Sequence, residues 1–402
     1  MRILWISDAG RPTGFSRATH EIAERLVSEY GHEVHVLAVG YDAADPFETQ
    51  LHLYRAEAGP SRNYLGFDRV VPLLEKVKPD VVVTLEDPAI LLRRLYGNPT
   101  DRKRLLLQRA PILAYLPIDG TGLPRAFLKL ATDTIPIAMS KFGQDQMPGA
   151  ELAYHGVDHV QFHPVDENHP VMTSAGLLTS KAECREAFSV PLDAFVVGRV
   201  DTNSGRKDWG STWRTFEAFA AMKHDRPTVA VFHTKKNNPG HGIDLEALIS
   251  RGSGTFYITG ADNWAIGDVI ALVNTFDVFL STSRGEGFGL TVAEALACEV
   301  PVVATDCSAI TEVVGPGGRL VPGVAPLANP YGVDLMICDY LAMADELYWL
   351  AKDENLRRDL GSAGRRHVIE SFNWDDTARR FDGFVRASTT RPADAVLTGQ
   401  PA

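Results

Sequence analysis

The chain has 402 residues, an ordinary globular composition and a formal net charge of −11. This length suffices for two domains of ordinary size, each with its own core. The acidic balance argues against a protein whose main task is to grip a polyanion, because such proteins carry a basic footprint. The four cysteines show no C-x-x-C spacing, which predicts reduced thiols and neither a disulfide framework nor a zinc site.

Short apolar runs alternate with helical stretches along the chain, a pattern typical of parallel sheets covered by helices. The first series of expected strands lies at residues 3–7, 34–39, 80–85, 112–116 and 135–140. The second series lies at residues 194–200, 228–234, 255–259, 278–282 and 302–305. The predicted fold class is therefore α/β, with two Rossmann-like domains.

A stretch rich in proline, histidine and acids, residues 161–176, separates the two series and suits a linker better than a helix or a strand. The expected domains are therefore residues 1–160 and residues 177–371. An amphipathic pattern predicts a further helix over residues 372–387. The remaining residues, 388–402, are rich in Thr, Pro, Ala and Gly, and we expect them to form a disordered tail.

Two carboxylates flank a glycine turn, Glu286-Gly-Phe-Gly-Leu-Thr-Val-Ala-Glu294, between an expected strand and an expected helix. Free backbone N–H groups in the turn and the helix dipole favour an anion such as phosphate. Glu286 can accept hydrogen bonds from a sugar, and Glu294 from the two hydroxyls of a ribose. Two solvated glutamates are the alternative, which the otherwise apolar helix around Glu294 disfavours. The predicted donor contacts of this segment are Gly287, Phe288, Gly289, Leu290 and Glu294.

Three cations, Arg199, Arg206 and Lys207, lie at or just beyond the carboxyl end of the strand at residues 194–200. Cleavage of a sugar–phosphate bond leaves negative charge on the departing nucleotide, so cations aimed at it stabilise the transition state more than the ground state. We predict that Arg199 and Lys207 are catalytic and that Asn203 supports the donor. Arg206 is as readily a surface residue in a turn as a donor contact. Because the chain has no D-x-D triplet, we predict metal-independent chemistry, no metal ligands and no cofactor.

Three more loops are candidates for donor contacts. A glycine-bearing loop ends the first strand, and it predicts contacts from Gly14 and Phe15, although a plain connection would look the same. The loops at His233 and Gly260 follow two strands of the second series and are expected to lie near the base. Backbone groups often read a base edge, so these loops do not identify it.

Together these motifs resemble the GT-B glycosyltransferases, specifically the retaining glycosyltransferase family 4 (glycosyl transferases group 1), whose signature is this E-x7-E segment. Arg199 and Lys207 match the family's paired diphosphate cations. The segment from His155 to Pro164 matches its G-V-D…F-x-P interdomain segment. The resemblance implies two Rossmann-like domains that face each other across a cleft, with the donor on the C-terminal domain, the acceptor on the N-terminal domain and a last helix that crosses back.

The first domain matches the family less well. Many members carry a sugar-binding histidine where this chain has the stretch before Gly120, and we predict that Asp119 takes over this contact. A turn aspartate that caps its own backbone explains Asp119 nearly as well. Glu86, Asp87 and Ser140 are acceptor candidates, although a helix start explains the first two and an N-cap explains Ser140.

The resemblance implies a retaining glycosyltransferase of the hexosyltransferase type that uses a nucleoside diphosphate sugar. Family members use front-face attack, so Glu286 is expected to position the sugar and not to act as a nucleophile. A UDP-sugar is favoured and a GDP-sugar stays open. Rival readings are a nucleotide-sugar epimerase, a phosphorylase, or a binding protein that has lost catalysis. The acceptor (glycan, lipid, protein, metabolite or modified nucleic acid) and the oligomeric state are left open.

No apolar run approaches the length needed to cross a membrane, which predicts a soluble, cytoplasmic protein. One leucine-rich segment is strongly basic. Its cations are Arg93, Arg94, Arg102, Lys103 and Arg104. A solvated helical face explains them better than contact with an anionic surface, and the second reading would allow peripheral membrane association.

Overall fold

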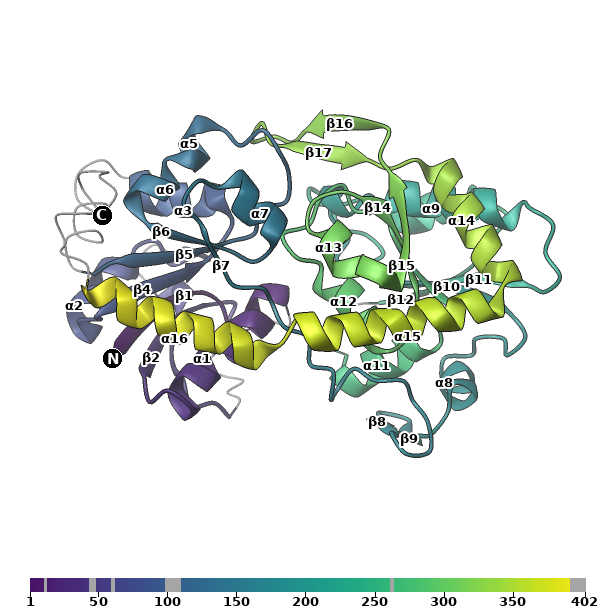
Figure 1. Cartoon of the computed structure of the whole chain (residues 1–402), viewed down its shortest axis with the longest axis horizontal. Helices are drawn as coiled ribbons and strands as arrows, with labels where there is room; N and C mark the ends of the chain where they lie inside the picture. The colour runs from purple at the N-terminus through teal and green to yellow at the C-terminus, as the bar shows by residue number, and fades with distance from the viewer. Residues whose placement is uncertain (11–12, 43–47, 59–61, 98–109, 261–263, 391–402) are drawn as a thin grey trace. The chain divides into compact units, whose positions relative to one another are not determined.

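The computed structural model describes residues 1–10, 13–42, 48–58, 62–97, 110–260 and 264–390. The chain divides into two compact units (Figure 1). The first unit contains Met1–Gly156, Asn329–Val333 and the chain from Asn373 onward. The second contains Val157–Ala328 and Asp334–Phe372, so by this division the stretch expected as a linker lies within the second unit.

The first unit contains a seven-stranded sheet with the order β3-β2-β1-β4-β5-β6-β7. Its neighbouring strands pair in parallel. The central strands are buried along most of their length, which explains their nearly continuous apolar sequences. The strands are β1 (Arg2–Asp8), β2 (Glu33–Val39), β3 (His52–Arg55), β4 (Val81–Leu85), β5 (Ile112–Leu116), β6 (Ile135–Ala138) and β7 (Glu151–Leu152).

Helices cover the first sheet, and one of them comes from the far end of the chain (Figure 1). Helix α16 (Trp374–Thr390) packs beside α1 (Gly14–Ser28). Its Phe381 ring lies 5.6 Å from the Trp5 ring and 5.0 Å from the Tyr115 ring, measured between centroids. The other described helices of this unit are α2 (Val70–Val77), α3 (Pro88–Tyr96), α5 (Arg125–Leu128), α6 (Leu130–Asp133) and α7 (Lys141–Gln146).

The second unit contains a six-stranded parallel sheet with the order β12-β11-β10-β13-β14-β15. Its strands are β10 (Phe195–Val200), β11 (Thr228–His233), β12 (Thr255–Thr259), β13 (Val278–Ser281), β14 (Val302–Asp306) and β15 (Gly318–Pro322). Two antiparallel pairs accompany it, namely β8 (Val171–Thr173) with β9 (Gly176–Leu178) and β16 (Ala325–Ala328) with β17 (Asp334–Ile337). Strand β8 lies in the stretch that was expected to contain no element.

Eight α-helices accompany this sheet in the described residues. They are α8 (Lys181–Ala187), α9 (Trp209–Ala220), α10 (Leu245–Ile249), α11 (Ile266–Asn274), α12 (Leu290–Ala297), α13 (Ile310–Val314), α14 (Tyr340–Lys352) and α15 (Glu354–Ser371). Apolar side chains of α9 and α14 share one core with β10, β11 and β13. Helix α12 packs against β13, β14 and α15.

Both sheets reverse their sequence order beside their first strand, between β1 and β4 and between β10 and β13. This is the order of a doubly wound Rossmann-like sheet, so the predicted α/β fold class is confirmed. Ligands of such sheets bind beyond the carboxyl ends of the strands at the reversal point. In the second unit, the loops after β10 and β13 are therefore the place to look for a site.

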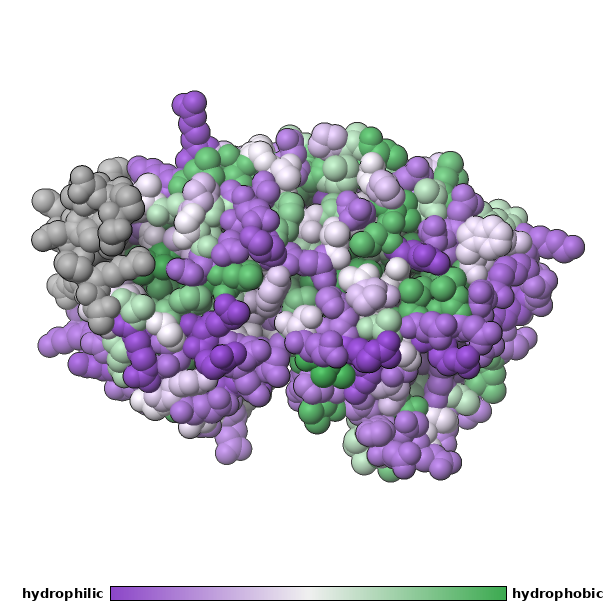
Figure 2. Space-filling model, in the orientation of Figure 1, coloured by the Kyte–Doolittle hydropathy of each residue, from purple (hydrophilic) through white to green (hydrophobic). Residues whose placement is uncertain are grey.

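Two further expectations concern membrane-spanning segments and the tail at residues 388–402. Figure 2 shows that the visible face is largely hydrophilic with scattered hydrophobic residues. Within the described part of the chain, we find no helix that is both long and apolar enough to cross a membrane. The expected tail begins inside α16, which continues to Thr390, and residues 391–402 lie outside the described residues.

Candidate functional site

The loops at the reversal point of the second sheet bring two cations to one carboxylate. The loop after β10 ends in a 3-10 turn, Gly205–Lys207, and the loop after β13 leads to α12. Lys207 Nζ donates to Glu286 Oε1 at 2.6 Å, and Arg206 Nη1 donates to Glu286 Oε2 at 2.5 Å. The backbone N–H of Glu286 donates to Ser308 Oγ at 2.8 Å. Glu286 is thus fixed on three sides.

The electrostatic state of Glu286 follows from this pairing. Burial alone would raise the pKa of its carboxyl, but Arg206 and Lys207 outweigh burial and lower the pKa to about 2. The group is therefore ionised at neutral pH. A buried, ionised carboxylate accepts hydrogen bonds and stabilises positive charge, which fits contact with sugar hydroxyls and does not fit a proton donor.

The cluster as a whole has more cations than carboxylates. Lys207 Nζ also lies 2.7 Å from Asp201 Oδ1, and Arg199 Nη2 lies 3.1 Å from Asp201 Oδ2. Arg199, Arg206 and Lys207 face Asp201 and Glu286, so three positive charges meet two negative charges. The excess of one positive charge favours an anionic ligand.

Arg199 does not occupy the position that the sequence predicted. Its side chain is completely buried, stacks on the ring of Trp209 with 4.6 Å from Cζ to the ring centroid, and donates to Thr282 Oγ1 at 2.8 Å. It also donates to the carbonyl of Lys207 at 2.7 Å. The guanidinium has no exposed edge for a diphosphate in this arrangement. Arg199 instead holds the backbone that carries Lys207.

The start of α12 is built on a glycine that cannot readily be replaced. Gly289 is the N-cap residue with φ 101°, and a Cβ there would lie 2.8 Å from Ile310 Cδ1. The cap has no side chain to accept from the first N–H groups of the helix, of which that of Val292 donates to the carbonyl of Gly289 at 3.0 Å. A helix start of this kind suits an anion, and an anion at this turn stays a prediction.

We predict that Gly289→Ala lowers the free energy of unfolding by about 1–3 kcal/mol, because a Cβ is strained at this φ and clashes with Ile310. Nucleotide binding should weaken together with stability. Gly383→Ala is the control, since a Cβ at Gly383 meets no atom within 4 Å. Urea unfolding of both variants tests this, and equal unfolding midpoints would contradict it.

The other predicted residues of this segment differ in their surroundings. Phe288 is buried and packs edge-to-face on Phe372 at 5.0 Å between centroids, so its ring belongs to the core and is not placed for a donor contact. Gly287 is buried, Leu290 is half-buried, and Glu294 is 4% exposed inside α12.

The predicted donor residues in the neighbouring loops mostly have structural partners. Asn203 donates to the carbonyls of Lys235 and Ile243 at 3.0 and 2.6 Å, so its amide fastens one loop to another. His233 is buried, its Nδ1 lies 2.8 Å from Thr259 Oγ1, and burial lowers its pKa to about 4. His233 is therefore neutral at physiological pH. Gly260 is exposed.

The first unit holds the remaining predicted donor and sugar contacts. Gly14 is exposed and begins α1, and Phe15 is half-buried. Thr13 caps the helix by accepting from the N–H of Ser16 at 3.0 Å. Asp119 is half-buried in the loop after β5.

Two side chains of this unit are buried where the sequence allowed surface roles. Arg94 is buried and donates from Nε to Glu86 Oε2 at 2.8 Å, so it is not available to an anionic surface, and the carboxylate of Glu86 is occupied. Ser140 is completely buried and caps α7 by accepting from the N–H of Gly143 at 3.0 Å, which removes it from contact with an acceptor. Arg94 neutralises the buried carboxylate of Glu86, and Ser140 accepts from a backbone N–H group of α7.

The remaining acceptor candidate and the remaining cations of the basic segment are not buried or are not described. Arg93 and Asp87 are exposed, and Asp87 precedes α3 at the N-cap position. Arg102, Lys103 and Arg104 lie outside the described residues.

Sequence reasoning missed two polar residues of the site. Asp201 follows β10 directly and shares Lys207 with Glu286. Ser308 accepts from the backbone of Glu286 across 22 residues. Asp201 could have been predicted, because it lies at the carboxyl end of a strand. Ser308 could not, because no motif in the neighbouring sequence indicates its contact with Glu286.

Residues 216–330 match the family model of glycosyl transferases group 1. These residues, nearly all of them in the second unit, are similar to the glycosyl transferases group 1. The match includes the whole E-x7-E segment, and it confirms the resemblance to the glycosyl transferases group 1.

Two curated relatives show how far the similarity extends. The capsular polysaccharide biosynthesis glycosyltransferase CapM of Staphylococcus aureus is 30% identical over 127 residues, which are 31% of this chain and 30% of CapM. The MMP alpha-(1->4)-mannosyltransferase of Mycolicibacterium hassiacum is 37% identical over 111 residues, 28% of this chain and 24% of that protein. The matched segments thus span less than a third of each relative.

Solved structures extend the likeness in fold to the whole chain. Sucrose-phosphate synthase from Thermosynechococcus elongatus has a TM-score of 0.71 at 18% identity, covering 96% of this chain and 98% of its own. HepE of Anabaena, solved in complex with UDP and glucose, has a TM-score of 0.67 at 16% identity, covering 96% and 100%. The predicted GT-B class of fold is therefore confirmed.

Proposed function

We propose that the chain is a glycosyltransferase that moves a sugar from a nucleoside diphosphate sugar to an acceptor hydroxyl. The observation that carries the proposal is the convergence of Arg206 and Lys207 on an ionised Glu286 beside the glycine-capped start of α12. A diphosphate needs cations and free N–H groups, and a sugar needs a carboxylate acceptor. These groups meet at the reversal point of a Rossmann-like sheet.

The cations have a role in both the bound and the reacting state. When a diphosphate binds, Arg206 and Lys207 turn part of their hydrogen bonding from Glu286 to phosphate oxygens. Glu286 then has acceptor capacity for the sugar hydroxyls and for positive charge on the ring. As the sugar–phosphate bond breaks, negative charge grows on the leaving phosphate, where the two cations and the helix start stabilise it.

Glu294 and the nucleotide complete the donor side of the proposal. Glu294, about one turn inside α12, is assigned to the ribose hydroxyls, as the resemblance implies. UDP is the favoured nucleotide, a preference supported by HepE, whose structure holds UDP and glucose. The excess positive charge of the cluster and the helix start take the part of a divalent cation, so we propose transfer without a metal ion. Retention by front-face attack rests on the resemblance.

The acceptor is proposed to bind through the first unit. Asp87 and Asp119 are the candidates for this role, since Asp87 is exposed and Asp119 is half-buried, whereas Gly14 and Phe15 stay candidates for donor contacts. The proposed location is the cytoplasm. The four cysteines are free, and three of them are buried, which suits a reducing compartment.

Calorimetric titration with UDP, GDP and their sugar conjugates, with a chelator present, tests the donor site. We expect one nucleotide to bind, and Arg206→Ala and Glu294→Ala to weaken it by about tenfold or more, because each removes a charged hydrogen-bonding group. Arg319→Ala is the control, since Arg319 is a half-exposed arginine paired with Glu346 at 3.7 Å. Nucleotide binding that ignores both substitutions would refute the site.

The products of a turnover assay separate the rival functions. A transferase releases nucleoside diphosphate and needs an acceptor, whereas an epimerase returns an altered sugar nucleotide without one. A phosphorylase consumes inorganic phosphate. A protein that binds the nucleotide sugar and yields none of these products is an inactive binder.

A further inference from the structure

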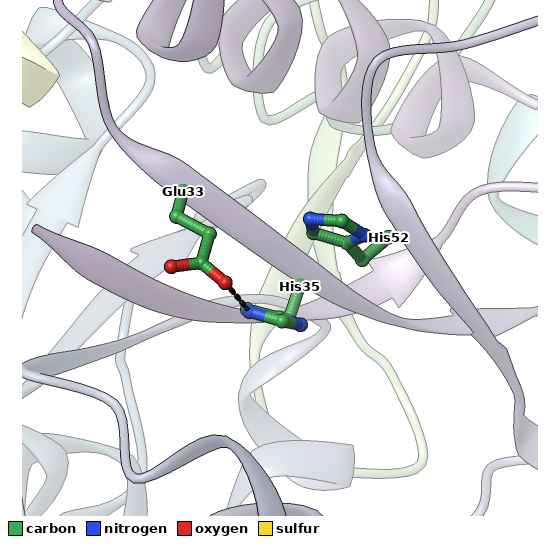
Figure 3. A group of neighbouring side chains, drawn as sticks. All are labelled: Glu33, His35 and His52. Carbon is green, nitrogen blue, oxygen red and sulfur yellow. Dashed lines mark hydrogen bonds and ion pairs between the residues drawn. The ribbon is translucent and has the colours of Figure 1, made fainter.

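Three side chains with metal-ligand atoms gather at the β3 edge of the first sheet and have no part in the proposed sugar transfer (Figure 3). Glu33 and His35 are two residues apart on β2, so they project from the same face. His52 is the register partner of His35 on β3. Among the residues that the structure describes, this is the one group whose three ligand atoms all lie within 4.8 Å of one another.

The spacing is close to what a metal ion requires. Zinc bonds of about 2.0–2.2 Å place neighbouring ligand atoms of a tetrahedral site about 3.3 Å apart. His35 Nε2 already lies 2.8 Å from Glu33 Oε1. The exposed His52 ring stacks on His35 at 4.7 Å between centroids. Because imidazole nitrogens bind a metal in the plane of the ring, the exposed His52 side chain has to rotate out of this stack to direct a nitrogen at an ion held by Glu33 and His35.

Tyr54 gives His35 a hydrogen-bond partner on its other nitrogen. His35 Nδ1 lies 3.1 Å from the Tyr54 hydroxyl. In the tautomer in which Nδ1–H donates to that hydroxyl, the Nε2 lone pair faces the Glu33 carboxylate and suits a bound cation, whereas in the other tautomer Nε2–H donates to Glu33. Ligating histidines are usually oriented in this way by a hydrogen bond on the nitrogen that does not bind the metal.

We propose that Glu33, His35 and His52 bind a divalent transition metal ion, Zn²⁺ by preference, with water as the fourth ligand. Two imidazoles and a carboxylate are a ligand set that suits Zn²⁺, whereas Mg²⁺ and Ca²⁺ take oxygen ligands. The ion ties the edge strand β3 to β2. This site departs from the expectation of a chain without metal ligands.

Calorimetric titration of the full chain with ZnCl₂ tests the proposal. We expect a single Zn²⁺ per chain, and His52→Ala and Glu33→Gln to weaken it by about tenfold or more. Both changes affect exposed side chains, so the fold should persist, and circular dichroism verifies this. His20→Ala is the matched control, because it removes a partly exposed imidazole whose Nδ1 lies 3.1 Å from a carboxylate oxygen of Glu24.

The outcomes distinguish the site from an ordinary surface pair. Loss of Zn²⁺ binding in His52→Ala and Glu33→Gln, with the control unchanged, supports the site. Equal binding of Zn²⁺ and Mg²⁺ overturns it, since imidazole ligands discriminate between these ions. Absence of Zn²⁺ binding by the unaltered chain, or equal affinity in the unaltered chain and both variants, overturns it as well.

Discussion

Replacing Lys207 with methionine is expected to weaken the binding of a nucleoside diphosphate by about a hundredfold, because loss of a largely buried charge partner costs about 2–5 kcal/mol. Lys207 holds Glu286 at 2.6 Å and Asp201 at 2.7 Å. Methionine keeps the length and apolar character of the stem, so the effect reports the charge. The rate of nucleotide release from the sugar donor should fall by a further factor of about 10²–10³.

Calorimetry and a nucleotide-release assay measure these two effects. Lys236→Met is the control, because Lys236 is a half-exposed lysine in the same unit that pairs with Glu246 at 2.9 Å. If Lys207→Met binds nucleotide as the unaltered chain does, the diphosphate lies elsewhere. A loss of structure would lower the unfolding midpoint, and urea titration separates that case from a lost contact.

Glu286→Gln is expected to separate binding from turnover. Glutamine keeps the shape of the side chain but removes the charge that engages Arg206 and Lys207. These cations are then free for the diphosphate, so nucleotide affinity should stay or rise, while turnover falls by about a hundredfold or more. A drop in nucleotide affinity without a change in turnover would show that Glu286 binds the nucleotide and not the sugar.

The pH dependence of stability gives Glu286→Gln a second readout. The pKa of Glu286 falls from an ordinary 4.5 to about 2, so its pairing stabilises the fold above pH 4.5 and is lost as the pH falls toward 2. The shift corresponds to about 3 kcal/mol. Urea unfolding between pH 6 and pH 2 should therefore show a steeper loss for the unaltered chain than for Glu286→Gln. Parallel curves would contradict the pairing.

The sequence was sufficient for the buried strands of both sheets, all of which lie where they were expected. Parallel strands buried on both faces require continuous apolar runs, and such runs can be recognised in the amino-acid sequence. Strand β3, with the sequence His-Leu-Tyr-Arg, is a half-exposed edge strand and carries no such run. Strand β16 is exposed throughout, so burial imposed no pattern on it.

The candidate site could be predicted in part. Glu286 and Lys207 follow the ends of neighbouring strands, and parallel topology brings such positions together. The sequence could not show that Arg206, and not Arg199, contacts Glu286, because this depends on the direction in which each side chain points. Arg199 lies inside β10, where Trp209 and Thr282 cover it, whereas Arg206 lies in the turn and reaches Glu286.

The packing of α16 has a consequence for biosynthesis. Domains made early on the ribosome generally fold while the rest of the chain is still being synthesised. The first unit cannot complete its core in this way, because Phe381 covers Trp5 and Tyr115. The apolar face of α1 and β1 therefore stays uncovered until nearly the whole chain has been translated. The second unit is finished first, although it begins later, and a nascent chain that stops short of α16 leaves the N-terminal unit open to aggregation and proteolysis.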